Sequence, residues 1–277
     1  MTKITAADVN SLRKKTGAGM MDCKKALVEA EGDFEKATDL LRKKGQKLAS
    51  RRAEREANEG VVISKTSDDK TKAFALMLNC ETDFVAQNQE VVDFAQALLN
   101  LGAEKECESA EALLAAEMAG RTVEENVTDM IGKTGEKMTI GGFEKVAGEK
   151  AFAYTHPGNK IASIAALNKA DVSDMDTVGK DVVMQIAAMA PVAIDKDGIP
   201  QDLIDRELEV GKDQAREEGK PEELIEKIAM GKLNKFYKES TLINQEFIKD
   251  SKKTVGQMLQ AADKELKVIS FKRLSLV

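Results

Sequence analysis

A single histidine, three cysteines and many carboxylates are the side chains in this sequence that could carry out chemistry. Because His156 is the single histidine, a metal centre built from several histidines is excluded. A Ser-His-Asp or Cys-His catalytic arrangement would have to use His156 as its histidine. The odd number of cysteines and the lack of a C-x-x-C pair argue against a disulfide framework and a structural zinc site. No two of the 48 Asp and Glu residues stand out as an acid and base pair. We therefore expect no catalytic site, no metal and no cofactor.

A second candidate is Gly132-Lys133-Thr134, which matches the end of the phosphate-binding pattern G-x-x-x-x-G-K-[ST]. Val127 occupies the position of the first glycine, whose backbone would approach the phosphates. The preceding apolar residues have helical spacing, whereas a phosphate loop follows a strand. An enzyme acting on a nucleotide is therefore the least supported interpretation.

A basic stretch at residues 42–55 raises the alternative of a nucleic-acid-binding scaffold, because Lys and Arg neutralise phosphates. Two properties argue against it: the whole chain has a net charge of -6, and only 4% of its residues are aromatic. A solvated helix or linker is favoured, and no direct contact with nucleic acid is expected.

Residues 79–87, Asn-Cys-Glu-Thr-Asp-Phe-Val-Ala-Gln, place an acidic residue and a large aromatic ring in a loop after an apolar strand. Composition alone favours a buried Phe84, because isolated phenylalanines usually pack in the core. The alternative is an exposed loop that contacts another protein. His156 lies in a turn beside Pro157-Gly158, where a surface or partner-contact role is favoured.

Three short helices are predicted in the first 45 residues. Thr5 and Asp8 form a capping box that begins the first helix, and Gly17 ends it. Asp33 caps the third helix, which Gly45 is expected to end. Residues 1–55 are therefore predicted to form a three-helix bundle followed by a basic linker.

A strand-turn-strand-helix unit follows and occurs twice. Its members are predicted at 61–63, 74–78 and 91–99, and again at 151–154, 161–167 and 182–187. Two such ββα halves indicate an α+β core, divided into residues 56–141 and 142–277.

An antiparallel helical hairpin is predicted within the second half at about residues 199–238. Pro200 and Pro221 each open a helix, and Gly219 separates the two. Narrow apolar seams on both helices predict an arm that projects from the core. A helix at 254–262 and a strand at 267–277 complete the chain.

Three motifs resemble the elongation factor Ts family, and the similarity extends over nearly the whole chain. They are Thr-Gly-Ala-Gly-Met-Met-Asp-Cys-Lys-Lys-Ala-Leu at 16–27, Asn79-Cys80 with Thr82-Asp83-Phe84-Val85, and Tyr154-x-His156. The resemblance implies a translation elongation factor without catalytic chemistry, which binds elongation factor Tu with GDP and promotes GDP release so that GTP can rebind.

The resemblance also implies roles for particular residues. The N-terminal bundle is similar to ubiquitin-associated domains and would touch the GTPase domain of elongation factor Tu through Met20 and its neighbours. Thr82 to Val85 carry the exchange motif, in which Phe84 would wedge beside the elements that support the partner's magnesium, while Asp83 anchors the loop. His156 is a further expected contact.

The remaining expectations concern partners and location. Elongation factor Tu is expected in its GDP and nucleotide-free forms, and a homodimer is left open because relatives carry a coiled-coil extension at the position of the arm. The start, MTKITAADVN, lacks a signal-peptide pattern, and no stretch approaches the roughly 18 apolar residues that span a bilayer. We expect a cytoplasmic protein that contacts no membrane and lacks the further C-terminal helix of some relatives.

Overall fold

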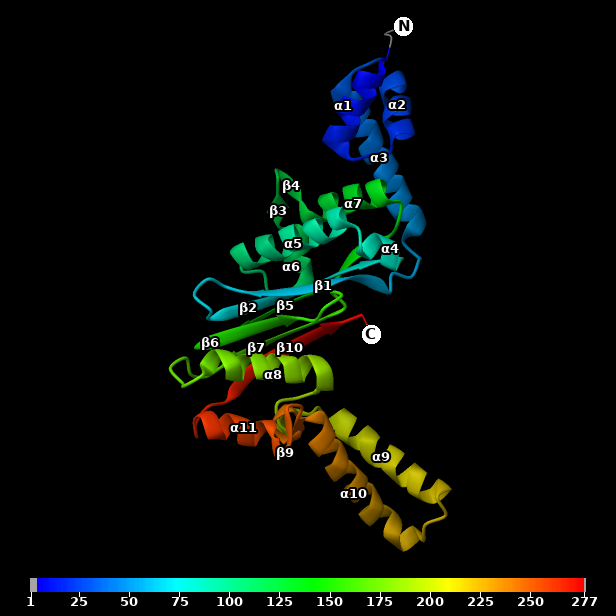
Figure 1. The fold of residues 1–277 in the computed structure, drawn as a ribbon. Helices are drawn as coiled ribbons and strands as arrows, with labels where there is room; N and C mark the ends of the chain where they lie inside the picture. Colours follow the sequence, from blue (N-terminus) through cyan, green and yellow to red (C-terminus); the bar gives the residue numbers. More distant parts are fainter. Residues whose placement is uncertain (1–3, 277) are drawn as a thin grey trace.

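The computed structural model describes residues 4–276, which form an elongated molecule (Figure 1). A helical bundle lies at one end, two sheets with their helices lie in the middle, and a helical arm lies at the other end. The predicted α+β class is confirmed. Within the described residues, no helix is both long and apolar enough to cross a lipid bilayer.

The N-terminal bundle consists of α1 (Ala6–Thr16), α2 (Met20–Glu29) and α3 (Phe34–Arg52). The predicted capping box is present, since the Thr5 hydroxyl accepts from the Asp8 amide while the Asp8 carboxylate accepts from the Thr5 amide. Gly17 ends α1 in the left-handed region at φ 71°. Leu12 and Leu27 are fully buried between the helices.

The prediction that Gly45 ends the third helix is wrong. Helix α3 continues through a buried Gly45 to Arg52, so most of the basic stretch 42–55 is helical. The reason is tertiary: Gly45 faces Gly132 of helix α7 (Val123–Thr134), and this contact outweighs the weak helix propensity of glycine.

The first sheet is antiparallel with strand order β1-β2-β5 and is covered on one face by helices. Its strands are β1 (Glu59–Thr66), β2 (Lys72–Cys80) and β5 (Met138–Ala147). Between β2 and β5 the chain forms α4 (Asp83–Ala86), α5 (Gln89–Glu104), α6 (Ala110–Ala115), β3 (Glu117–Met118), β4 (Arg121–Thr122) and α7. Strand β5 continues across the division predicted at residue 141.

The second sheet repeats this plan with strand order β10-β7-β6. Its strands are β6 (Lys150–Thr155), β7 (Ile161–Leu167) and β10 (Val268–Ser275), and its helices are α8 (Met175–Met189) and α11 (Val255–Ala262). The repeated hairpin and helix therefore exist as predicted, and each sheet gains a third antiparallel strand outside the repeat.

The two sheets pack face to face, with helices on the outer sides (Figure 1). Small residues allow this close approach, since the cluster between the sheets is Ala73, Ala75, Val146, Ala151, Ile164 and Ala166. The strands are therefore buried on both faces, which explains their nearly continuous apolar runs.

The arm is an antiparallel pair of helices, α9 (Gln201–Glu217) and α10 (Glu222–Ser240). A Cβ placed on Gly211 would lie 3.3 Å from the Cα of Ala229, so the helices cross closely. The hairpin has the form that Pro200 and Pro221 predict. Short segments join it to the core: η1 (Lys196–Gly198), η2 (Leu242–Asn244), β8 (Glu246–Phe247) and β9 (Asp250–Thr254).

Candidate functional site

Phe84 stands exposed on the one-turn helix α4, directly after strand β2. Its exposed fraction is 84%, larger than that of any other exposed large apolar side chain in residues 4–276. Asp83 beside it is also exposed. The composition-based interpretation that Phe84 packs in the core is therefore wrong. An exposed aromatic ring of this size indicates a contact with another molecule.

Thr82 holds this turn to the core. Its hydroxyl donates to Glu136 Oε1 at 2.7 Å, and its amide donates to Glu136 Oε2 at 3.0 Å. The same hydroxyl oxygen accepts from the Val85 amide at 3.4 Å and caps α4. Val85 itself is half-buried against the first core cluster. The turn therefore presents Phe84 on a fixed base.

Glu81, the residue before Thr82, ties the end of α3 to the start of β5. Both of its carboxylate oxygens accept from Arg52 Nη1, at 2.7 and 2.8 Å, and Oε1 also accepts from the Lys137 amide at 2.6 Å. The Lys137 amide and then the Arg52 guanidinium hold the pKa of Glu81 below its ordinary value. The carboxylate is therefore charged at neutral pH and partnered on both sides.

Cys80 lies beneath the turn and is fully buried. Its thiol donates to the Thr82 carbonyl oxygen at 3.2 Å. Burial raises the pKa of this thiol to about 11, so it stays protonated at neutral pH and serves as a packing residue rather than a nucleophile.

His156 lies at the same end of the paired sheets as the Phe84 turn. Its exposed ring accepts from or donates to the Tyr154 hydroxyl at 2.9 Å through Nδ1. The next residues of this turn reach strand β1, because the Val62 amide donates to the Asn159 carbonyl oxygen at 2.7 Å. Strand β1 begins opposite Cys80, so the structure brings the His156 turn and the Phe84 turn to one end of the paired sheets.

Met20 is the first residue of α2 and lies on the N-terminal bundle, with 53% of its side chain exposed. Met21 is exposed as well, at 62%. Gly19 lines a cleft together with Gly135 of the core, and the next core residue, Glu136, bonds to Thr82. The structure therefore places Met20 in a separate unit from the Phe84 turn, on the far side of this cleft.

Arg52 and Glu136 are the residues of this site that sequence reasoning missed. Glu136 bonds to a residue 54 positions earlier, and Arg52 pairs with one 29 positions later. Residues so far apart in the chain form no local sequence pattern from which either pairing could be predicted. The basic stretch is the one local signal that includes Arg52, and its composition favours a solvated helix rather than a buried ion pair.

The alternative chemistries find no support in the geometry. Gly132-Lys133-Thr134 forms the last turn of α7, and Lys133 Nζ donates to Glu90 at 2.8 Å, so the glycine-rich loop that cradles phosphate is absent from these residues. In the basic stretch, Arg42 and Lys44 pair with Asp39 and Asp22. Within residues 4–276, no group of three or more His, Cys, Asp or Glu is placed to hold a metal ion.

Comparisons with known proteins agree with the motifs. The family model described as Elongation factor TS matches residues 81–276, which include the Phe84 turn, the His156 turn and the arm. Proteins named Elongation factor Ts from Christiangramia forsetii and Cytophaga hutchinsonii are each 48% identical to this chain, with 100% of both chains covered. A third, from Porphyromonas gingivalis, is 48% identical over 99% of this chain and 98% of its own length. The chain belongs to the elongation factor Ts family.

Proposed function

We propose that this protein binds elongation factor Tu in its GDP form and promotes the release of GDP, after which GTP rebinds. The observation that carries the proposal is the exposed Phe84 ring on a turn that hydrogen bonds hold to the core. Burying a phenylalanine side chain contributes about 1.5–3 kcal/mol. Because the turn is ordered before binding, little of that free energy is lost to ordering it.

Thermodynamic linkage connects this contact to exchange. A protein that binds nucleotide-free elongation factor Tu more tightly than the GDP form must lower the affinity for GDP by the same factor. We place Phe84 between elements of the partner that support its magnesium, with Asp83 stabilising the inserted loop. Displacing that ion weakens the attraction for the phosphates. No covalent bond is formed or broken, so the activity is exchange rather than catalysis.

Other surfaces of the chain supply the rest of the interface in this proposal. The bundle within residues 1–55, similar to ubiquitin-associated domains, contacts the GTPase domain through Met20. The core halves, 56–141 and 142–277, contact two domains of elongation factor Tu, its GTPase domain and the domain at its tip, and His156 adds a contact. The arm at about 199–238 packs as a short coiled coil and is the surface through which a homodimer would form. The exchange takes place in the cytoplasm.

The test measures release of fluorescently labelled GDP from elongation factor Tu as a function of the concentration of this protein. We expect Phe84→Ala to lower the maximal acceleration by at least about tenfold, because one tenfold step corresponds to about 1.4 kcal/mol of lost contact. The matched control is Ile248→Ala, which removes an exposed apolar side chain (42%) between β8 and β9. Equal acceleration by wild type and Phe84→Ala refutes the wedge, and a wild type that accelerates nothing refutes exchange.

Met20 and His156 can be tested in the same assay. Both are placed at the rim of the proposed interface rather than at the wedge. We expect Met20→Ala and His156→Ala to raise the concentration needed for half-maximal release while the maximal rate stays within about twofold of wild type. A fall in the maximal rate alone would contradict the rim placement.

A further inference from the structure

Helix α3 belongs to two packed units at once. Its first residues, Phe34 and Ala37, pack in the core of the N-terminal bundle. Leu48 and Ala49, more than two turns further on, pack against the core cluster of the first sheet. At a rise of about 1.5 Å per residue, the 19 residues of α3 span about 28 Å without interruption. The bundle is therefore joined to the core by a continuous helix.

The middle of α3 is fixed by a close helix crossing. A Cβ on Gly132 of α7 would lie 3.3 Å from the Cα of Gly45, and a Cβ on Gly45 would lie 3.4 Å from the Thr128 carbonyl oxygen. A larger side chain at either glycine must push the two backbones apart. The glycines therefore set the distance between α3 and α7 and, with it, the tilt of the bundle.

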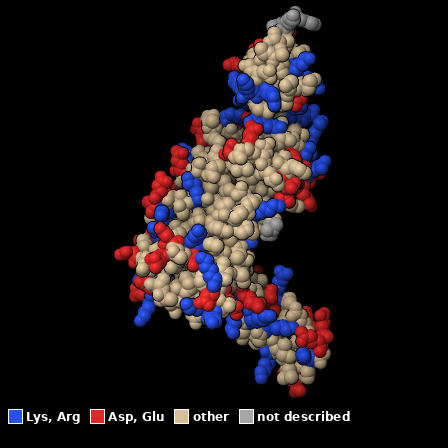
Figure 2. Space-filling view, in the orientation of Figure 1, with Lys and Arg blue, Asp and Glu red and all other residues tan. Residues whose placement is uncertain are grey.

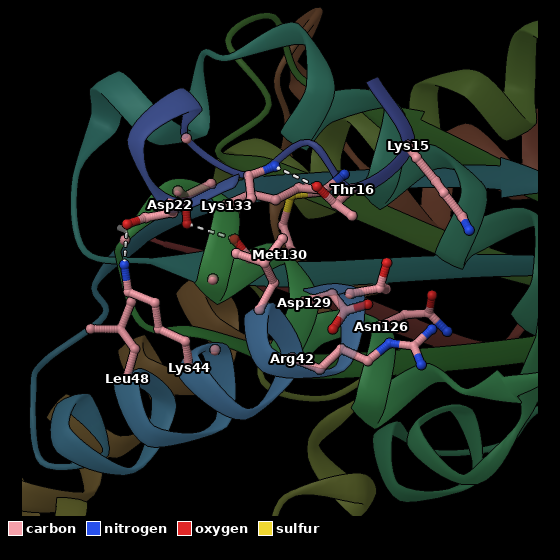
Figure 3. A pocket seen from close by; sticks show the side chains of 18 of the residues that line it. Lys15, Thr16, Asp22, Arg42, Lys44, Leu48, Asn126, Asp129, Met130 and Lys133 are labelled. Carbon is pink, nitrogen blue, oxygen red and sulfur yellow. Dashed lines mark hydrogen bonds and ion pairs between the residues drawn. The ribbon is translucent and has the colours of Figure 1, made fainter. Parts of the chain in front are cut away.

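A cleft of ≈ 540 Å³ separates the rest of the bundle from α7 (Figure 3). Lys44 and Asp22 form an ion pair on its bundle side, and Asp129 and Met130 line its core side. Lys133 reaches across, because a Cβ on Gly17 would lie 2.5 Å from its Cε. Figure 2 shows Lys and Arg atoms gathered where the bundle meets the core. Helices α1 and α2 pack mainly on each other and on α3, so α3 determines where the bundle lies.

The C-terminal end of α3 is fixed to the base of the Phe84 turn. Arg52 pairs with Glu81, and their side chains are only 30% and 13% exposed. Lys137 Nζ donates to the carbonyl oxygens of Ala53 and Arg55, at 2.7 and 2.8 Å, just past the end of the helix. A partly desolvated pair with additional hydrogen bonds holds its geometry better than an ion pair in water.

We propose that α3 acts as a strut that fixes the Met20 surface relative to the Phe84 turn, with Gly45, Gly132 and the Arg52–Glu81 pair as positioning residues for exchange. This inference rests on the proposed function, because it assigns both surfaces to the same partner. Two contacts held at a fixed spacing make the second one intramolecular once the first has formed. The strut therefore raises the affinity for the partner and leaves the action of Phe84 after insertion unchanged.

The first arm of the test measures the strut in the free protein. Spin labels go on Val28→Cys in α2 and Ile269→Cys in β10, whose native side chains are 58% and 47% exposed. The three native cysteines are buried and stay unlabelled. We expect one narrow distance distribution for the otherwise wild-type protein, a shifted one for Gly132→Leu and a broader one for Arg52→Ala. Gly231→Leu is the control, because nothing lies within 4 Å of a Cβ at that helical position.

The second arm measures GDP release with unlabelled forms of the same variants. We expect Gly132→Leu and Arg52→Ala to raise the half-maximal concentration about tenfold, with the maximal rate within twofold of wild type. Arg52→Lys should recover part of the affinity, because a single nitrogen, Nη1, makes both contacts with Glu81 and an ammonium group keeps that charge.

The proposal is overturned if the distance distributions change while the half-maximal concentration does not, if the maximal rate falls in proportion, or if neither variant alters the distances. These outcomes differ from failure of the proposed function, in which wild type itself releases no GDP while the distance measurements still report on the strut.

Discussion

Replacing Thr82 by valine tests how rigidly the Phe84 turn must be held. Valine keeps the shape of threonine but loses the hydroxyl, which removes the 2.7 Å bond to Glu136 and the 3.4 Å cap bond from Val85. A hydrogen bond to a charged group contributes about 1.5–3 kcal/mol, and a cap contributes about 0.5–2 kcal/mol. Because the site is half-exposed and the cap bond is long, we take low values that together give about 2 kcal/mol.

That loss acts locally. A four-residue helix such as α4 has almost no stability of its own, so the hydrogen bonds from its N-cap residue Thr82 to Glu136 decide whether it stays folded. A change of 2 kcal/mol shifts the ordered fraction of the turn up to about 30-fold, and the apparent affinity for the partner falls by the same factor as the competent fraction. We expect the apparent affinity of Thr82→Val for the partner to be about 5- to 30-fold lower than that of wild type.

The assay is GDP release at increasing concentrations of the variant, together with amide hydrogen exchange of the residues around α4. Thr82→Ser is the matched control, because it keeps the hydroxyl and should remain within about threefold of wild type. Faster amide exchange in α4 should accompany the lost affinity in Thr82→Val alone. If the valine and serine variants behave alike in both measurements, the hydroxyl does not hold the turn and the reasoning is wrong.

Two further predictions concern stability. Burial raises the pKa of Cys80 from 9.0 to about 11, so the folded protein keeps a proton that the unfolded chain loses. The contribution of this thiol to the free energy of unfolding is complete below about pH 9 and falls as the pH rises towards 11. When the pH is raised from about 8 to 10.5, the free energy of unfolding measured by denaturant titration should fall by about 2 kcal/mol more in wild type than in Cys80→Ala. Equal decreases in the two proteins would contradict the raised pKa of Cys80. A Cβ on Gly179 would lie 2.1 Å from the Phe152 ring, so Gly179→Ala should destabilise by about 1–3 kcal/mol. Gly231→Ala, in an open part of α10, should instead stabilise by up to about 1 kcal/mol, and thermal unfolding of both variants checks the opposite signs.

Local signals in the sequence predict the ends of helices and the turns well. The capping box at Thr5, the glycine stop at Gly17 and the helix openings at Pro200 and Pro221 all depend on groups within four residues of each other. Gly45 follows the same local rule and misleads, because the reason for a glycine there lies on another helix. A rule based on neighbours in the chain cannot detect a crossing between α3 and α7.

The candidate site likewise has a part that local sequence signals predict and a part that they do not. The segment 79–87 is recognisable as a loop after a strand, but its composition favours a buried Phe84, and only the family resemblance predicts the exposure that is observed. The residues that fix the loop, Glu136 and Arg52, come from distant parts of the chain. Long-range pairing of this kind depends on the packing of the sheets, which periodicity does not encode.

The arrangement around Phe84 separates what holds the site from what the site contacts. In residues 4–276, every buried side-chain nitrogen or oxygen has a hydrogen-bond partner, so the network beneath the turn is complete before any partner binds. Binding therefore does not need to form that network, and the change of environment falls on Phe84 itself. It follows that substitutions beneath the turn should change how often Phe84 is correctly presented, whereas a substitution of Phe84 should change what its insertion does to the partner.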